Sequence, residues 1–187
     1  MAALRNTAES YGIIAQALHW LVAALVLVQL ALGAYAAALP FGLARLQWLS
    51  RHKSLGLAIL AFVALRLLWR AKNRPPALPA SMPALQRQSA VLMHWLLYAL
   101  LVAAPLTGWL HASAAGLSIN WFGLVQVPDL VARDPDAAAT LKAAHQACVG
   151  SLAILIAGHA GAALWHALAL RDGILARMLP WTSRGNR

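Results

Sequence analysis

Acidic residues are scarce in this sequence. The 187 residues include 5 Asp and Glu against 15 Lys and Arg, and charged residues of all kinds make up only 11% of the chain. Hydrophobic residues make up 61%, against roughly half in soluble domains. A soluble protein of this length could not cover so much apolar surface, so we expect lipid to cover it. The composition therefore excludes an ordinary soluble domain.

Cysteine is nearly absent. Cys148 is the one cysteine of the chain, so an intrachain disulfide is impossible. The sequence also lacks a Cys-x-x-Cys-His motif, which excludes the covalent attachment of a c-type haem. A single cysteine in an apolar segment is more typical of a small packing residue than of a metal ligand.

The basic residues lie at the ends of apolar segments rather than on a soluble basic face. This pattern is typical of membrane proteins and argues against nucleic acid as a partner. No Asp or Glu lies inside any long apolar segment, which disfavours an ion-coupled transporter. Membrane lipid is therefore the first partner that the sequence predicts.

Four apolar segments are long enough to cross a bilayer, which takes about 20 helical residues. We predict transmembrane helices over residues 13–39, 52–70, 88–111 and 143–170. Residues 41–51 should form a short connection, and the proline-rich stretch 71–87 an extended linker. Asp134 followed by Pro135 is typical of a helix start, so a helix should begin there and run into the fourth span. The predicted fold is one all-α membrane domain over 1–187, a bundle of four transmembrane helices.

Basic residues are distributed unequally between the two ends of the predicted spans. Four spans place both termini on one side, together with ten basic residues: Arg5, Arg66, Arg70, Lys72, Arg74, Arg87, Arg171, Arg177, Arg184 and Arg187. The other side has five: Arg45, Arg51, Lys53, Arg133 and Lys142. The positive-inside rule then predicts that both termini are cytoplasmic. Arg66 lies near the end of its span, where we expect its side chain to reach the surface.

The segment 143–170 has no charged residue but carries His145, His159 and His166. His145 and His159 are 14 residues apart, which on a helix is about 21 Å of rise and about 40° short of four full turns. They therefore share a face at two depths. With the predicted topology, His52 lies level with His145 and His19 with His159. Two imidazoles facing each other across a bundle are what a non-covalent b-type haem needs, so we expect two haem sites in the bundle core.

Two further histidines have more than one candidate role. His94 lies about as deep as His19, six residues into the third span, so depth alone leaves it as a rival ligand for the inner site. His166 follows His159 by seven residues on the same face and suits the polar lining of a quinone site, as does His94. A zinc site is disfavoured because it usually takes three or four ligands in one place. Glycines near the histidines, such as Gly56 and Gly150, should leave room for a porphyrin.

Five segments resemble the bacterial cytochrome b561 family in order and spacing: Leu18-His19-Trp20, His52-Lys53-Ser54-Leu55-Gly56, Arg66-Leu67-Leu68-Trp69-Arg70, His145, and the stretch from Gly158 to His166. The resemblance covers nearly the whole chain. It implies a four-helix, two-haem protein of the bacterial inner membrane. It also implies that His19 and His159 hold one haem and His52 and His145 the other, with His94 not a ligand.

The resemblance further implies an oxidoreductase, because one member of the family passes electrons from superoxide to ubiquinone. We expect a donor on the outer side of the membrane to reduce the outer haem, held by His52 and His145, and a membrane quinone to accept electrons from the inner one. Arg51, Lys53 and Arg45 would steer a small anion such as superoxide toward His52. The alternative is an electron-relay or anchor subunit for a separate dehydrogenase or cytochrome partner.

Overall fold

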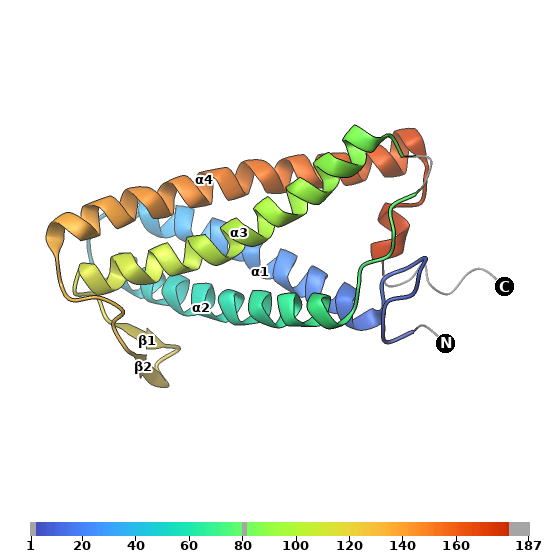
Figure 1. Cartoon of the computed structure of the whole chain (residues 1–187). Helices are drawn as coiled ribbons and strands as arrows, with labels where there is room; N and C mark the ends of the chain where they lie inside the picture. Colours follow the sequence, from blue (N-terminus) through green and yellow to red (C-terminus); the bar gives the residue numbers. More distant parts are fainter. Residues whose placement is uncertain (1–2, 80–81, 180–187) are drawn as a thin grey trace.

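The structure is a computed structural model that describes residues 3–79 and 82–179. Four long helices dominate it: α1 (Ile13–Ala38), α2 (Leu43–Lys72), α3 (Ala84–Ala114) and α4 (Pro135–Trp165) (Figure 1). The shortest has 26 residues and rises about 39 Å, more than the roughly 30 Å of a bilayer core. All four are apolar enough to cross a membrane. The predicted membrane-spanning four-helix bundle is confirmed.

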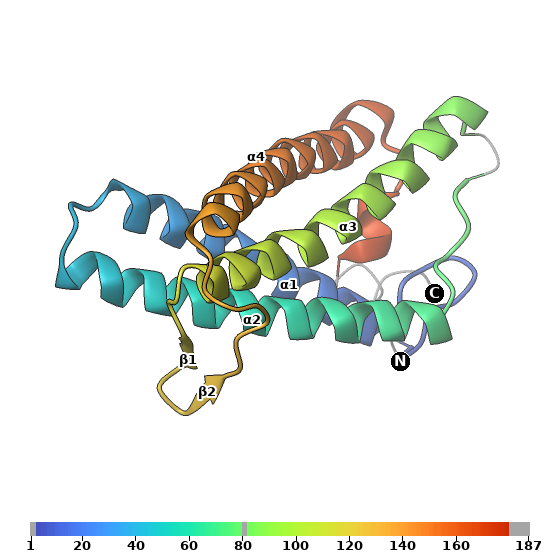
Figure 2. The same cartoon turned by 60° about the vertical axis from the view of Figure 1, so that its left-hand side comes forward.

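The helices form two antiparallel pairs. α1 packs mainly on α2, and α3 mainly on α4, while a smaller contact between α2 and α3 joins the pairs (Figure 2). All four helices meet near mid-length in one cluster of buried side chains: Val22, Val26, Ile59, Val63, Tyr98, Leu101 and Leu152. Burial of apolar side chains at this crossing, at about 1.5–3 kcal/mol each, holds the pairs together.

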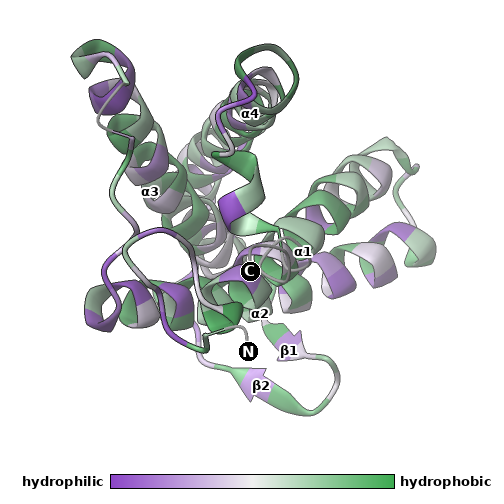
Figure 3. Cartoon of the chain, turned by 90° about the vertical axis from the view of Figure 1, so that its right-hand side faces the viewer, coloured by the Kyte–Doolittle hydropathy of each residue, from purple (hydrophilic) through white to green (hydrophobic). Residues whose placement is uncertain are grey.

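Large apolar side chains also cover the outside of the bundle. Leu27 is 58% exposed, Ile154 74% and Leu168 72%. In Figure 3, hydrophobic residues lie on the outward sides of the helices as well as between them. A surface of this kind fits acyl chains rather than water.

Several helix boundaries differ from those predicted from hydropathy. α2 begins at Leu43 rather than at residue 52, so most of the predicted connection 41–51 is helical. α3 begins at Ala84, directly after Pro83, so the predicted linker 71–87 is shorter than expected. Hydropathy marks only the part of a helix that lies in lipid. The extensions contain good helix formers and no internal proline, so they continue the helices beyond it.

The predicted start of α4 is confirmed. Oδ1 of Asp134 accepts hydrogen bonds from the backbone N–H groups of Asp136 at 3.0 Å and Ala137 at 3.1 Å. Pro135 follows at the first helical position, where its missing N–H costs nothing. α4 then continues to Trp165 and ends in one π-helical turn, His166–Leu170.

A short β-hairpin follows α3 and was not predicted. Its strands, β1 (Ile119–Trp121) and β2 (Val125–Val127), are antiparallel. Phe122 and Gly123 have positive φ angles of 49° and 77°, which make the tight turn. Three-residue strands are too short to give a periodic signal. The hairpin docks on α2, where Trp121 Nε1 donates to the Ser54 carbonyl at 3.1 Å.

The N-terminal and C-terminal segments meet at the opposite end from the hairpin (Figures 1 and 2). The Tyr11 N–H donates to the Arg177 carbonyl at 3.4 Å, and Trp20 Nε1 to the Met178 carbonyl at 2.9 Å. A 3₁₀ turn, Leu175–Met178, carries these acceptors back across the start of α1. The meeting of the two segments agrees with an even number of spans.

Candidate functional site

Four of the seven histidines form two facing pairs. The ring centroids of His52 and His145 are 6.2 Å apart, with their planes at 82°. Those of His19 and His159 are 6.3 Å apart, with their planes at 68°. α4 supplies one member of each pair, and α2 and α1 supply the others. On α4, Leu152 of the buried cluster lies between His145 and His159, so the two pairs are at two depths.

The distance between the ring centroids in each pair can be compared with that expected for two histidines bound to one metal ion. Two metal–nitrogen bonds of about 2 Å, plus roughly 1 Å from each nitrogen to its ring centre, put two ring centroids about 6 Å apart across one metal ion. Both pairs match this separation. His94 lies 5.3 Å from His159, closer than a shared metal would allow. The geometry therefore favours His19 over His94 as the partner of His159.

Two protein ligands per site suit a haem better than a bare metal ion. Within residues 3–79 and 82–179, no group of three or more His, Cys, Asp or Glu side chains is arranged to hold a metal. A b-type haem would take two histidines from each pair's helices as its protein ligands, and the apolar space between the helices would suit its faces. The residues present therefore fit a b-type haem.

We call His52 and His145 the outer pair, and His19 and His159 the inner pair, after the predicted topology. Hydrogen bonds around the outer pair orient its rings. His145 Nδ1 donates to the Ala104 carbonyl of α3 at 2.8 Å, so its Nε2 keeps a free lone pair for a metal. Gln29 Nε2 donates to the His52 carbonyl at 2.9 Å and lies 3.4 Å from His52 Nε2. Nδ1 of His52 is buried and has no hydrogen-bond partner among the described residues. The tautomer of His145 is therefore set for ligation through Nε2, whereas Nε2 of His52 faces the Gln29 amide.

Two glycines leave space for the rings of His52 and His145, but they are not the glycines that the sequence led us to expect. A Cβ added at Gly33 of α1 would lie 2.9 Å from His52 Cε1, and one at Gly108 of α3 3.1 Å from His145 Cε1. Gly56, which we expected to make room for a porphyrin, instead faces Gln29. Gly150 has open space around it. Sequence reasoning missed Gly33 and Gly108 because neither is near a predicted ligand histidine in the chain.

A cavity of about 410 Å³ adjoins the inner pair. His19, His94 and His159 line it, together with core side chains and the arginines Arg66 and Arg70. The predicted outward path of Arg66 is wrong. Its Nη2 donates to His19 Nδ1 at 2.8 Å, and its guanidinium lies 5.3 Å from the centroid of Tyr98. The interior offers it a lone pair and an aromatic face, which replace contacts with water.

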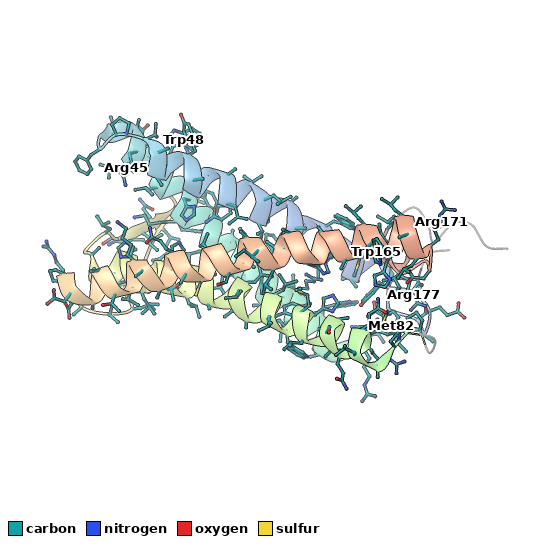
Figure 4. The ribbon with its side chains drawn as sticks, turned by 90° about the horizontal axis from the view of Figure 1, so that it is seen from above. Arg45, Trp48, Met82, Trp165, Arg171 and Arg177 are labelled. Carbon is teal, nitrogen blue, oxygen red and sulfur yellow. The ribbon has the colours of Figure 1, made fainter. Side chains whose placement is uncertain are left out.

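A second cavity, of about 380 Å³, brings His94 and His166 together between α3 and α4. His166 Nε2 lies 3.1 Å from Gln86 Nε2, and its Nδ1 lies 2.5 Å from Asp172 Oδ2. Trp165 lies beside this cavity, at the same end of the molecule as Arg171 and Arg177 in Figure 4. The sequence had pointed to both histidines but not to Gln86 or Asp172.

Asp172 follows the π-helical turn, outside the membrane-spanning segment. Its small burial would raise the pKa of the carboxyl, but hydrogen bonds from His166 and from the Ile174 N–H outweigh burial and hold the pKa below its ordinary value of 3.8. Arg171 adopts a left-handed backbone conformation with φ 52°, which turns the chain so that Asp172 faces His166. His166, which lines the second cavity, therefore contacts a carboxylate that is exposed to solvent.

The predicted steering residues at the other end differ in their surroundings. Lys53 Nζ donates to the carbonyls of Leu117 and Ser118, both at 3.3 Å, and so ties α2 to the segment before the hairpin. Arg51 is exposed, and its guanidinium stacks 4.4 Å from the centroid of Trp48. Arg45 donates to the Leu39 carbonyl at 3.4 Å and lies with Trp48 at this end in Figure 4. Of these three residues, Arg51 alone is exposed, whereas Arg45 and Lys53 are half-buried.

Comparisons with known proteins agree with this architecture. The family model for prokaryotic cytochrome b561 matches residues 10–181. Cytochrome b561 homolog 2 of Escherichia coli (strain K12) is 34% identical over 93% of this chain and 93% of its own. Cytochrome b561 homolog 1 of the same organism is 32% identical over 69% of this chain and 73% of its own. The probable superoxide oxidase CybB of Yersinia pestis is 32% identical over 92% and 97%.

The model match covers almost the whole chain, and two of these relatives match it nearly end to end. Membership in their family implies b-type haem and electron transfer across a bacterial membrane, which the facing histidines and the four apolar helices suit. The chain is a multi-pass membrane protein that belongs to the prokaryotic cytochrome b561 family.

Proposed function

We propose that the protein holds two b-type haems and oxidises superoxide at the outer face of the inner membrane while reducing a quinone near the inner face. His52 and His145 would hold the outer haem, and His19 and His159 the inner one. The observation that carries the proposal is the pair of ring separations, 6.2 Å and 6.3 Å, at two depths of one bundle. Bound haem supplies the one-electron redox chemistry that no side chain here can supply.

The stoichiometry fits two one-electron carriers in series. Two superoxide anions each lose one electron and become O₂. One ubiquinone gains two electrons and two protons and becomes ubiquinol. The chain's own part is to attract the anion, to hold the cofactors and to bring protons to the quinone.

The direction of transfer follows from the charges. Among the described residues, eight basic residues lie toward the end where the chain's first and last segments meet, against five toward the hairpin end, and Arg184 and Arg187 lie outside the described residues. This asymmetry supports cytoplasmic termini and an outer face at the hairpin. Superoxide crosses a bilayer poorly because charge is costly there, so a collector needs a cationic outer face. Arg51, exposed and one residue from His52, would supply part of that potential, and the name of the Yersinia pestis relative supports superoxide as donor.

The quinone would bind in the cavity between α3 and α4. His94 and His166 line it, and Gln86 adds an amide at its edge. Asp172 would hold His166 in orientation and exchange protons with the cytoplasm. His166 could then donate a proton to the reduced quinone oxygen.

The test combines haem quantification with donor specificity. The purified protein should bind two haems per chain, give a b-type reduced-minus-oxidised spectrum and reduce a soluble quinone when superoxide is generated. A content well under two haems in a fully loaded preparation would refute the two-site assignment. A protein that carries two haems but is reduced by a co-purifying dehydrogenase, and not by superoxide, would be an electron-relay subunit instead.

A further inference from the structure

Two arginines on one face of α2 line the inner cavity without a carboxylate to neutralise them. Arg66 and Arg70 are one helical turn apart, and both are half-buried. Neither forms an ion pair with an acidic side chain of the described residues; their contacts are His19 and the rings of Tyr98 and Trp95. Cations next to an apolar cavity are costly unless an anion pairs with them. An anionic group bound in the cavity would offset this cost.

The hydrogen bond between Arg66 and His19 conflicts with metal ligation. A guanidinium can only donate, so Nδ1 of His19 must accept, and the proton of the neutral ring then lies on Nε2. A ring in this state has no free lone pair for iron. His145 has the opposite arrangement, because its Nδ1 donates to a carbonyl and leaves Nε2 free. Arg66 must therefore leave His19 before that ring can bind a metal as a neutral ligand.

We propose that Arg66 and Arg70 bind the propionate carboxylates of the inner haem, and that Arg66 transfers from His19 Nδ1 to a propionate when the cofactor enters. This inference rests on the proposed inner site at His19 and His159. A b-type haem is an apolar macrocycle with two carboxylates, which matches an apolar cavity with two cations. Arginine pairs with carboxylates through two parallel hydrogen bonds.

A spare donor lies in the same cavity. Nε1 of Trp69 is buried without a hydrogen-bond partner among the described residues, and Trp69 lines the cavity together with Arg66 and Arg70. A buried indole N–H without an acceptor is costly, and a carboxylate oxygen would satisfy it. Three donors from one stretch of α2 thus point to one anion. A lipid phosphate has similar chemistry, so the test must separate the two sources.

The experiment pairs a side-chain change with a change in the cofactor. Full-length protein, stripped of haem and carrying His145→Ala so that only the inner site loads, is titrated with protohaem and with its dimethyl ester, which lacks the charges. Esterification should weaken binding by about tenfold or more, the value of a charge-assisted hydrogen bond. Arg66→Gln should weaken protohaem binding similarly and ester binding little. Such non-additivity marks a direct contact.

Controls make each outcome decisive. Lys72→Gln removes an exposed cation from the end of the same helix and should leave both affinities unchanged. Arg66→Lys keeps the charge and covers the case in which Arg66→Gln does not fold. It should lose part of the discrimination between protohaem and ester, because it loses the planar fork. The midpoint potential of the inner haem should fall in Arg66→Gln, since a nearby cation favours the reduced state.

Two results would overturn the inference. If Arg66→Gln weakens binding of the ester as much as binding of protohaem, the two effects are additive and Arg66 does not contact the propionates. If the ester binds as tightly as protohaem and Arg66→Gln instead removes tightly bound phospholipid, the anion is a lipid phosphate. If the His145→Ala protein binds no haem whose ligation depends on His19, the proposed inner site itself is wrong, a result that this titration reports separately.

Discussion

Gly33→Ala should release the outer haem without weakening the fold. The added Cβ would lie 2.9 Å from His52 Cε1 and 3.1 Å from Nδ1, whereas ordinary contacts begin at 3.4 Å. The ring must therefore withdraw by about 0.5 Å, the difference between 3.4 Å and 2.9 Å. Metal–ligand distances in good sites hold to within about 0.2 Å. A displacement of this size should cost at least the 10- to 100-fold in affinity typical of a disturbed supporting shell.

The helix itself should gain from the same change. Alanine is favoured over glycine in a helix interior by about 1 kcal/mol, so α1 should be at least as stable. The two effects separate in the assay, where haem content and redox titration report the outer site and thermal unfolding reports the fold. Gly108→Ala, whose Cβ would lie 3.1 Å from His145 Cε1, should have a weaker effect because the ring needs to move only about 0.3 Å.

Gly42→Ala is the matched control, since nothing lies within 4 Å of a Cβ added there. It should retain both haems and both potentials. The reasoning fails if Gly33→Ala loads the outer haem with unchanged affinity and potential, because His52 would then have room that the structure does not give it. It also fails if Gly33→Ala and Gly42→Ala lose haem to the same extent.

Three further predictions concern the proposed haem ligands, the second cavity between α3 and α4, and the outer face. His52→Ala should lose the outer haem and keep the inner one, and His19→Ala should do the reverse, as redox titration would resolve. The pKa of Asp172 is lowered, so its contact with His166 is present above the ordinary value of 3.8 and is lost only as the pH falls through the lowered value. Asp172→Asn should therefore slow quinone reduction throughout pH 5–8 in stopped-flow traces, with no change in haem reduction by superoxide. Arg51→Glu should slow reduction by superoxide but not by a neutral donor, and added salt should do the same, because the Debye length falls to about 10 Å at 0.1 M. Lys53→Glu should in addition lower thermal stability, since its ammonium holds two backbone carbonyls.

The sequence predicted the parts of the site that follow from one helix. The difference in depth between His145 and His159, and their shared face, follow from the 14 residues of helix between them. The order of the spans predicts that His52 lies at the depth of His145 and His19 at the depth of His159. The choice between His19 and His94 needed the fold, because both lie at the same depth. Only the ring separations, 6.3 Å against 5.3 Å from His159, distinguish them.

The supporting residues could not be predicted because they come from helices distant in the chain. Gly33, Gly108 and the Ala104 carbonyl carry no chemical signal of their own, and each matters only through the histidine that it faces. The predicted direction of the Arg66 side chain was wrong for a similar reason. An arginine near a span end usually reaches for the surface, and only the packing shows that His19 and Tyr98 offer it partners inside.

The four helices contribute unequally to the two proposed haem sites. α4 carries one proposed ligand of each pair, so its helical rise fixes the distance between the two sites. α1 and α2 carry one partner each. α3 carries no proposed ligand, yet its Ala104 carbonyl sets the tautomer of His145, and its His94 shares the second cavity with His166. A shift of α3 along α4 would therefore disturb the outer ligand and the quinone cavity together while leaving the spacing of the two sites unchanged.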